Sequence, residues 1–182
     1  MRKANTQKLA FSGVIAALCT VLLFLSGVIP VATIALPALA GCLLIAVVVE
    51  AGTRWAFGVY ATCSVLSLLL VADKEAALFY ILFFGYYPVL YAFLGRIRNK
   101  AAKMAAKLVI FNAAMLLETF LSIRVLGIPW ENVPFLGPYT AVVLLVLFNL
   151  VFLLYDWAMD DLILRYVRAV HPRVRKMFRP GR

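Results

Sequence analysis

Glu118 has the most informative chemistry in the chain, because it places a carboxylate inside a strongly apolar stretch. This stretch reads LETFLSIR, from Leu117 to Arg124. On a helix that turns 100° per residue, one face about 120° wide collects Asn112, Met115, Glu118, Thr119 and Ser122. Arg124 falls on roughly the opposite side, so we do not expect it to pair with Glu118. A carboxylate at the centre of a bilayer costs about 2.5 kcal/mol or more, so this face is predicted to point inward.

A pocket for a small molecule is one interpretation of this acid. Counted inward from the predicted outer surface, Asn149 on the last apolar segment and Tyr86 or Tyr87 on the fourth reach the depth of Glu118. The other interpretation is a protonated Glu118 that joins helices through hydrogen bonds, a frequent role of polar residues in membranes. With the pocket as the working hypothesis, the predicted substrate-binding residues are Glu118, Asn149, Tyr86, Tyr87, Tyr80, Asn112, Thr119 and Trp130.

The fourth apolar segment, YILFFGYYPVLYAF, is unusually aromatic. The aromatic residues predicted to share one face, by their helical spacing, are Tyr80, Phe84, Tyr87 and Tyr91. Gly85 and Pro88 lie in the middle of the segment, and a proline removes a backbone donor, so a kink is predicted where a ligand can approach. An aromatic stripe alone is more often packing than a ligand platform, and only its match in depth with Glu118 favours the platform.

Two connections on the predicted outer side carry charged or aromatic residues. They read ADKEA (72–76) and PWENVPFLGPY (129–139), and the second includes Trp130. Such connections are suited to form a lid over an outward-facing site, although connections that are merely solvated have the same composition.

The remaining reactive residues indicate neither metal binding nor hydrolysis. The three cysteines, Cys19, Cys42 and Cys63, lie in apolar segments without a CxxC or Cys/His cluster and are expected to be packed small residues. The single histidine, His171, lies in a basic tail beside Pro172, has no plausible partner nucleophile or ligand set, and is expected to have a structural role. No GxxxxGK[ST], HExxH or GxSxG motif occurs, so we expect a protein that is not an enzyme, with no cofactor and no metal.

Acidic residues also occur at the inner end of the last helix. Asp156 and Asp160 are four residues apart, and so are Asp161 and Arg165. This spacing predicts ion pairing at the membrane interface rather than a proton relay, which needs acids deeper in the membrane.

The elements that must position these residues are membrane helices. The 182 residues are 65% hydrophobic and only 14% charged, whereas soluble domains are about 45–50% apolar. Six apolar runs occur, at about 9–29, 35–51, 56–71, 76–94, 108–128 and 139–164, of which the second and third are short for a spanning helix. The prediction is an all-α, six-transmembrane-helix bundle that forms a single domain over 1–182.

Charge placement predicts the orientation of the bundle. With the N-terminus inside, all eighteen Lys and Arg residues except Lys74 and Arg124 lie on the inner side, and Lys107 is counted among them. Both termini are therefore predicted to be cytoplasmic. The net charge of +10 then reflects topology and contact with anionic lipids, especially through the basic tail at 165–182, rather than nucleic-acid binding.

The first apolar segment contains small residues at the spacing that lets another helix approach closely. Ser12 and Ala16 are four apart, as are Gly13 and Ala17. This alanine-rich segment, KLAFSGVIAALCTVLL, together with six helices, about 180 residues and a basic tail, resembles the substrate-binding S component of an energy-coupling factor (ECF) transporter. The resemblance covers nearly the whole chain but rests on architecture and one loose motif.

The resemblance implies a bacterial cytoplasmic-membrane protein that captures a vitamin-like micronutrient on the outer side, between the outer loops and the last three helices. It implies docking on a transmembrane coupling protein driven by two cytoplasmic ATPases, through a surface that maps onto Ser12, Gly13, Ala16 and Ala17. It also implies that the subunit topples in the bilayer during transport. The acidic, tyrosine-rich region favours a small polar or cationic aromatic substrate, which no subfamily signature identifies.

Two rival classes remain open at this point. A non-transporting scaffold, comparable to the small polytopic MreD-like proteins, would use the first helix and basic tail to bind other membrane proteins, while Glu118 only orders the bundle. An intramembrane enzyme that acts on lipid ranks last, because the sequence contains no recognisable nucleophile or metal set.

Overall fold

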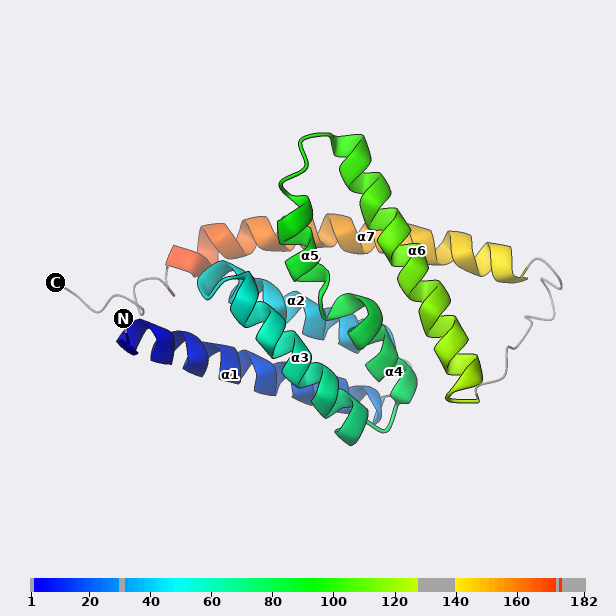
Figure 1. Ribbon diagram of the computed structural model, residues 1–182, viewed down its shortest axis with the longest axis horizontal. Coiled ribbons are helices and arrows are strands. Elements are labelled where there is room, and N and C mark those ends of the chain that lie inside the picture. Colours follow the sequence, from blue (N-terminus) through cyan, green and yellow to red (C-terminus); the bar gives the residue numbers. More distant parts are fainter. Residues whose placement is uncertain (1, 30–31, 128–139, 173, 175–182) are drawn as a thin grey trace.

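The protein is helical throughout its defined secondary structure. The computed structural model describes residues 2–29, 32–127, 140–172 and 174. In chain order the elements are α1 (Arg2–Ser26), α2 (Ala35–Glu50), α3 (Thr53–Leu70), α4 (Lys74–Phe79), the π-helix η2 (Tyr80–Phe84), α5 (Tyr87–Leu94), α6 (Lys100–Arg124), α7 (Thr140–Arg165) and the π-helix η4 (Tyr166–Val170). Figure 1 shows these helices running back and forth, with the start of α1 and η4 at the same end of the molecule.

The helices have the length and composition of membrane spans. Within the described residues, five segments are long and apolar enough to cross a bilayer: 5–26, 53–70, 74–94, 100–124 and 142–170. The third of these contains α4, η2 and α5, whereas α2, with 16 residues, is shorter. The structure therefore agrees with a membrane-embedded helical bundle, while α2 remains short, as the sequence indicated for the second apolar run.

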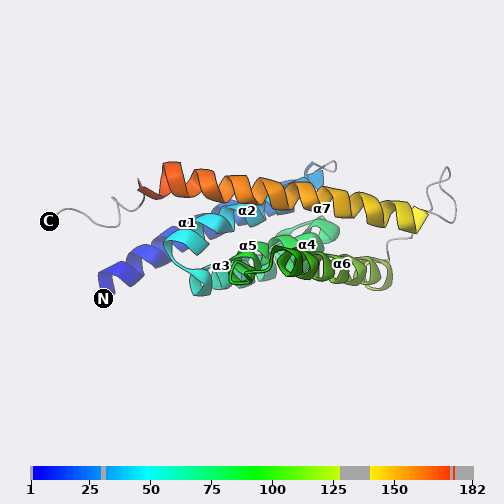
Figure 2. The same cartoon turned by 90° about the horizontal axis from the view of Figure 1, so that it is seen from above.

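The bundle is arranged around α2. This helix packs against α1, α3, α5 and η2, and half of its residues are buried. Figure 2 shows α7 along one side of the molecule and α3, α4, α5 and α6 along the opposite side. Two apolar clusters result: the first joins α1, α2 and α3, and the second joins α2, η2, α6 and α7.

The fourth segment is interrupted in its middle, where Gly85 and Pro88 predicted a kink. The backbone N–H of Gly85 donates to the carbonyl of Tyr80 at 2.7 Å, which is the i to i+5 pattern of a π-helix. Helix α5 then begins at Tyr87, with Tyr86 as its N-cap and Pro88 in its first turn, where the missing N–H has no intrahelical acceptor to lose. Figure 1 shows α4 and α5 separated by this break.

The interruption separates the four aromatic residues that were predicted to share one face of a continuous helix. Tyr80 is fully buried in the first cluster, against α1 and α3, whereas Phe84 and Tyr87 belong to the second cluster. The prediction of one continuous stripe is wrong because a π turn takes more than four residues. The helix after the turn is therefore rotated relative to the helix before it. The same segment consequently packs on two sides of the bundle.

Two glycines allow η2 to fit between its neighbours. A Cβ added to Gly41 of α2 would collide with the backbone carbonyl of Phe84, and a Cβ added to Gly85 would come within 2.6 Å of the Tyr60 ring. Pro88, four residues after Phe84, has no N–H to offer that carbonyl. The carbonyl of Ile81, in the same interrupted region, accepts a hydrogen bond from the Tyr60 hydroxyl at 2.8 Å.

Replacement of Gly41 tests this close approach. We expect Gly41→Ala to destabilise the purified protein by about 1–3 kcal/mol, because backbone on both sides must move to make room for a methyl group. The matched control is Gly58→Ala on α3, where an added Cβ meets nothing within 4 Å. That variant should be neutral or slightly stabilising, by up to about 1 kcal/mol, since alanine is the better helix former. Equal unfolding temperatures in detergent for both variants would contradict the packing described.

Candidate functional site

The inward face of α6 carries the polar residues of the candidate site. The buried residues of this helix follow each other at intervals of three or four and are Lys107, Phe111, Ala114, Glu118 and Ser122. Glu118 and Ser122 are thus buried as predicted. Asn112, Met115 and Thr119 lie beside this stripe and are half-buried. The buried face is therefore rotated about the helix axis, relative to the predicted face, by less than the 100° that separates consecutive residues.

Glu118 faces the bundle near the far end of α6 and is only 5% exposed. The Ser122 hydroxyl donates to Glu118 Oε1 at 2.7 Å. A second acid, Glu75, lies on α4, which packs against α6, and is half-buried. Burial of the Glu118 charge without a proton or a cation is costly.

Asp73 fixes the helix that carries Glu75. It is the N-cap of α4: its Oδ1 accepts from the backbone N–H of Ala76 at 3.0 Å, and its Oδ2 accepts from the Thr33 hydroxyl at 2.8 Å. We refer to Asp73, Glu75 and Glu118 as the acidic group. It lies at the side of the bundle that charge placement predicts to be outer.

Asn149 pairs with Asn112 and is not brought against Glu118. Each amide donates to the other's carbonyl oxygen, at 2.9 and 3.0 Å. Each amide nitrogen also donates to the backbone carbonyl four residues earlier, Leu108 or Leu145, at 2.8 Å. Both donor hydrogens of each side chain are thereby used. In this arrangement the pair joins α6 to α7, and a ligand would have to displace it.

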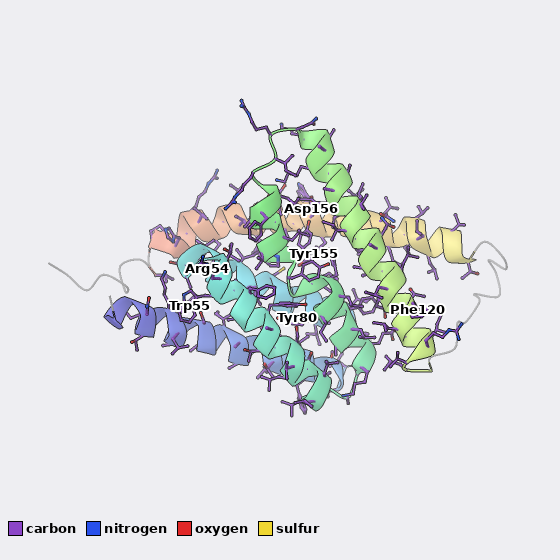
Figure 3. All side chains as sticks on the ribbon, viewed as in Figure 1. Arg54, Trp55, Tyr80, Phe120, Tyr155 and Asp156 are labelled. Atoms are coloured by element: carbon purple, nitrogen blue, oxygen red, sulfur yellow. The ribbon has the colours of Figure 1, made fainter. Side chains whose placement is uncertain are left out.

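The predicted tyrosines have different surroundings from one another. Tyr80 packs beside Tyr60, with ring centroids 6.1 Å apart. Tyr86 is half-buried and packs edge-on against the Tyr60 ring at 5.9 Å. Tyr87 turns towards α7. Figure 3 shows Tyr80 apart from the region of Asp156 and Tyr155. The last predicted residue, Trp130, lies outside the described residues, as does the 129–139 connection.

An aromatic cavity lies between η2, α6 and α7. Its walls are Ile34, Phe79, Phe83, Phe84, Phe111, Met115, Phe148, Val151, Phe152 and Tyr155. Two of these rings, Phe111 and Phe152, stack at a centroid distance of 4.5 Å. The free space is about 20 Å³, enough for roughly one water molecule, whereas small-molecule pockets enclose about 300–1,000 Å³. A vitamin-sized ligand would therefore require this cavity to widen.

A buried ion pair, which the sequence did not predict, joins α6 to α7 on the other side of the cavity. Lys107 Nζ contacts Asp156 Oδ1, and the two residues are 2% and 4% exposed. The Tyr87 hydroxyl donates to the same carboxylate oxygen. Figure 3 shows Asp156 on α7 where α5 and α6 approach it. Lys107 was counted among the cations of the inner side, and the structure shows its ammonium group enclosed by the bundle rather than exposed at a surface.

Further polar contacts extend this charge cluster, which we define as Tyr87, Tyr91, Lys107, Asp156 and Asp160. The Tyr91 hydroxyl donates to Asp160, and Lys107 Nζ lies 4.3 Å from the centre of the Tyr91 ring. The spacing of residues in α6 could have predicted that Lys107 is buried. Lys107 precedes Phe111 by four residues and Glu118 by eleven, and these spacings place all three on one face of the helix. Of the ion pairs predicted on α7, Asp161 and Arg165 do pair, at 2.6 Å.

The histidine lies beside a carboxylate that the sequence did not identify. His171 Nδ1 lies 2.9 Å from Glu50 Oε1, which also accepts from the Tyr166 hydroxyl at 3.3 Å. Lys8 donates to the carbonyl of Ala51 next to it, at 3.2 Å. These contacts attach η4 to the end of α2, so His171 holds elements that are far apart in sequence.

The predicted docking residues on α1 have unequal exposure. Ser12 is buried and Ala16 is half-buried, whereas Gly13 and Ala17 are exposed. The last three line an apolar groove of about 540 Å³ between α1 and α3, together with Thr20, Val21, Phe24, Leu25, Leu66 and Leu70. A Cβ at Gly13 would meet nothing within 4 Å. Another helix can therefore approach α1 here.

Replacement of one member of the buried ion pair should lower the free energy of unfolding far more than replacement of both. We expect Lys107→Leu and Asp156→Leu each to destabilise the protein by about 3–5 kcal/mol, because the remaining charge stays buried and unpaired. The double variant should recover most of that loss. The control pair is Asp161→Leu and Arg165→Leu, which are exposed, and each should cost no more than about 1 kcal/mol. Unfolding in detergent measures all of these, and additive single effects would contradict the pairing.

Neither metals nor relatives point to a function for these sites. Among the described residues, no group of three or more His, Cys, Asp or Glu side chains is placed to hold a metal ion. Comparison of the chain with protein-family models, curated proteins and solved structures gives no match. The function must therefore be inferred from the buried acids, the charge cluster and the groove.

Proposed function

We propose that the chain is the membrane-embedded, substrate-binding subunit of an ATP-driven uptake transporter of the ECF type. The observation that carries this proposal is the burial of Glu118 inside the bundle, where α6 packs against the helix that carries the half-buried Glu75. Ionisable residues within membrane helices face partners or pathways, and isolated ones are rare because of their cost. A substrate that enters from the outer side and binds Glu118 would compensate the buried carboxyl group, which explains why the chain contains it.

The acidic group indicates which substrates fit. The buried carboxyl group of Glu118 favours a ligand that brings a positive charge or several hydrogen-bond donors, since either compensates the buried acid. The neighbouring cavity walls are aromatic and suit the flat, apolar part of the same ligand. A small micronutrient with a cationic or donor-rich head and an aromatic body matches both features.

Substrate entry requires α7 to move away from α6. Four of the cavity-lining residues belong to α7, at positions 148, 151, 152 and 155. The Asn112–Asn149 pair closes the same interface with neutral hydrogen bonds, which exchange for ligand contacts at smaller cost than the buried ion pair would. We therefore expect the ligand to displace this amide pair and to leave the charge cluster intact.

The energy source lies in partner subunits under this proposal. The groove around Gly13 and Ala17 provides a surface for a transmembrane coupling protein, which two cytoplasmic ATPases drive. The basic residues predicted on the inner side would contact anionic lipids. The location that follows is the cytoplasmic membrane of a bacterium.

Substitution of the buried acid tests the binding proposal. Purified protein is titrated by calorimetry with a panel of vitamins that includes thiamine and pyridoxamine as cations, and biotin and pantothenate as anions. At least one cationic compound should bind, and Glu118→Gln should weaken its binding at least tenfold, because the carboxylate is lost while the shape is kept. Asp161→Asn, an exposed acid on α7, should bind as the unaltered protein does. Unchanged binding in Glu118→Gln would remove Glu118 from the site.

A membrane scaffold of the MreD-like kind is the alternative function. It is favoured by the closed Asn112–Asn149 pair and by the small size of the cavity, because a scaffold needs a dry, packed interior. On this alternative the groove on α1 binds a different membrane protein, and no vitamin binds. The identity of the partner therefore separates the two functions.

Co-purification through the groove makes this distinction. We expect Gly13→Phe and Ala17→Phe to reduce recovery of the partner at least fivefold, because the added rings fill the groove. Leu116→Phe, on an exposed part of α6, should leave recovery unchanged. A coupling protein with two ATPases among the proteins lost would support transport, and loss of cell-shape proteins instead would support the scaffold. Equal recovery from all variants would exclude the groove as the docking surface.

A further inference from the structure

Two cysteines from different helices are buried at the contact between α1 and α3, beneath the groove. Cys19 of α1 and Cys63 of α3 each have no exposed surface, and the Cys63 thiol lies against the turn of α1 that contains Cys19. Both belong to the apolar cluster formed by α1, α2 and α3. The sequence indicated only packed small residues at these positions, because nothing in it brings residues 44 positions apart together.

Hydrogen bonds to the backbone hold both thiols at the contact between α1 and α3. The Cys63 thiol reaches the carbonyl of Ala16 at 3.5 Å, and the Thr20 hydroxyl points at Cys63 Sγ at 3.9 Å. Cys19 lies between Ala16 and Thr20 in the same helix, and its thiol donates to the carbonyl of Ala40 at 3.3 Å. The side chain of Cys63 is therefore directed at the turn of α1 that contains Cys19.

The dithiol lies directly below the proposed docking surface. Ala16 and Thr20, which contact Cys63, also line the groove. The third cysteine, Cys42, is on α2 and contacts Tyr155 and Met159 at the second cluster instead.

We propose that Cys19 and Cys63 form an oxidisable dithiol that links α1 to α3 through a disulfide. The oxidant is a lipid-soluble two-electron acceptor of the quinone class. Two S–H bonds break and one S–S bond forms, while two electrons and two protons pass to the quinone, which becomes a hydroquinone. The link fixes the spacing of α1 and α3 and therefore the width of the groove between them.

Formation of the disulfide is independent of the proposed function, whereas its effect on docking rests on it. In the oxidised state the groove can no longer adjust to a partner helix. Partner release on oxidation is the expected consequence, and reduction by a thiol should restore docking. The formation of the disulfide and its effect on docking are tested by separate measurements.

The first experiment treats the full chain in lipid nanodiscs with diamide, an azo compound that accepts the same two electrons and two protons. Free thiols are then counted after denaturation, and the protein is digested without reduction. Two of the three thiols should disappear, and a linked peptide pair containing Cys19 and Cys63 should weigh two hydrogens less than its parts. Cys42→Ala should lose both of its thiols in the same way, whereas Cys19→Ala and Cys63→Ala should keep theirs.

Three free thiols after treatment, or a link that includes Cys42, would overturn the proposal. Peptide mapping of the unaltered chain decides this even if one of the alanine variants fails to fold. Partner recovery is then compared before and after oxidation, with Cys63→Ala as the control. If the disulfide forms but recovery does not change, the dithiol stands and its regulatory role at the groove is excluded. If no partner is recovered in either state, the regulatory role is excluded with the docking proposal, and the dithiol still stands.

Discussion

The contact between Lys107 and Asp156 is the constraint on which the arrangement of α7 depends. Helix α7 is apolar on most of its surface, so hydrophobic burial alone gives it little reason to prefer one rotation or depth over another. A carboxylate in the same helix must find a donor, and the enclosed ammonium group on α6 and the Tyr87 hydroxyl provide two. A buried ion pair is weak evidence for stability, but this one determines which faces of α6 and α7 meet. Once Asp156 is placed, Asn149 and Asp160 are placed as well.

The interruption of the fourth segment allows this placement. A continuous α-helix would keep Tyr80 and Tyr87 on one face, and both could not reach their observed neighbours. The π turn and the break at Pro88 let Tyr80 fill the space between α1 and α3 while Tyr87 meets α7. The glycines at 41 and 85 make room for the backbone of this irregular turn. Backbone irregularity in a membrane is tolerated where it is enclosed by protein, and η2 packs against α2, α3 and α6.

Local patterns in the sequence were sufficient for the helices, for the burial of Glu118 and Ser122 and for the break near Pro88. Each of these depends on residues a few positions apart, within the reach of periodicity and backbone chemistry. The partners of Lys107 and His171 lie 49 and 121 positions along the chain. Their pairing is decided by how helices rotate and cross, which an apolar helix does not encode in its pattern. The convergence of Asn149 with Glu118 was predicted from depth alone, and depth does not specify rotation.

The π-helix η2 also has a consequence for the evolution of the chain. A five-residue turn contains one residue more than the α-helical turn it replaces, so the register of everything after it depends on that extra residue. Deletion of a single residue between 80 and 84 would restore a regular helix and rotate α5 by about 100°. Tyr87 and Tyr91 would then turn away from Asp156 and Asp160. Homologous chains that share this charge cluster should therefore keep the length of η2 unchanged.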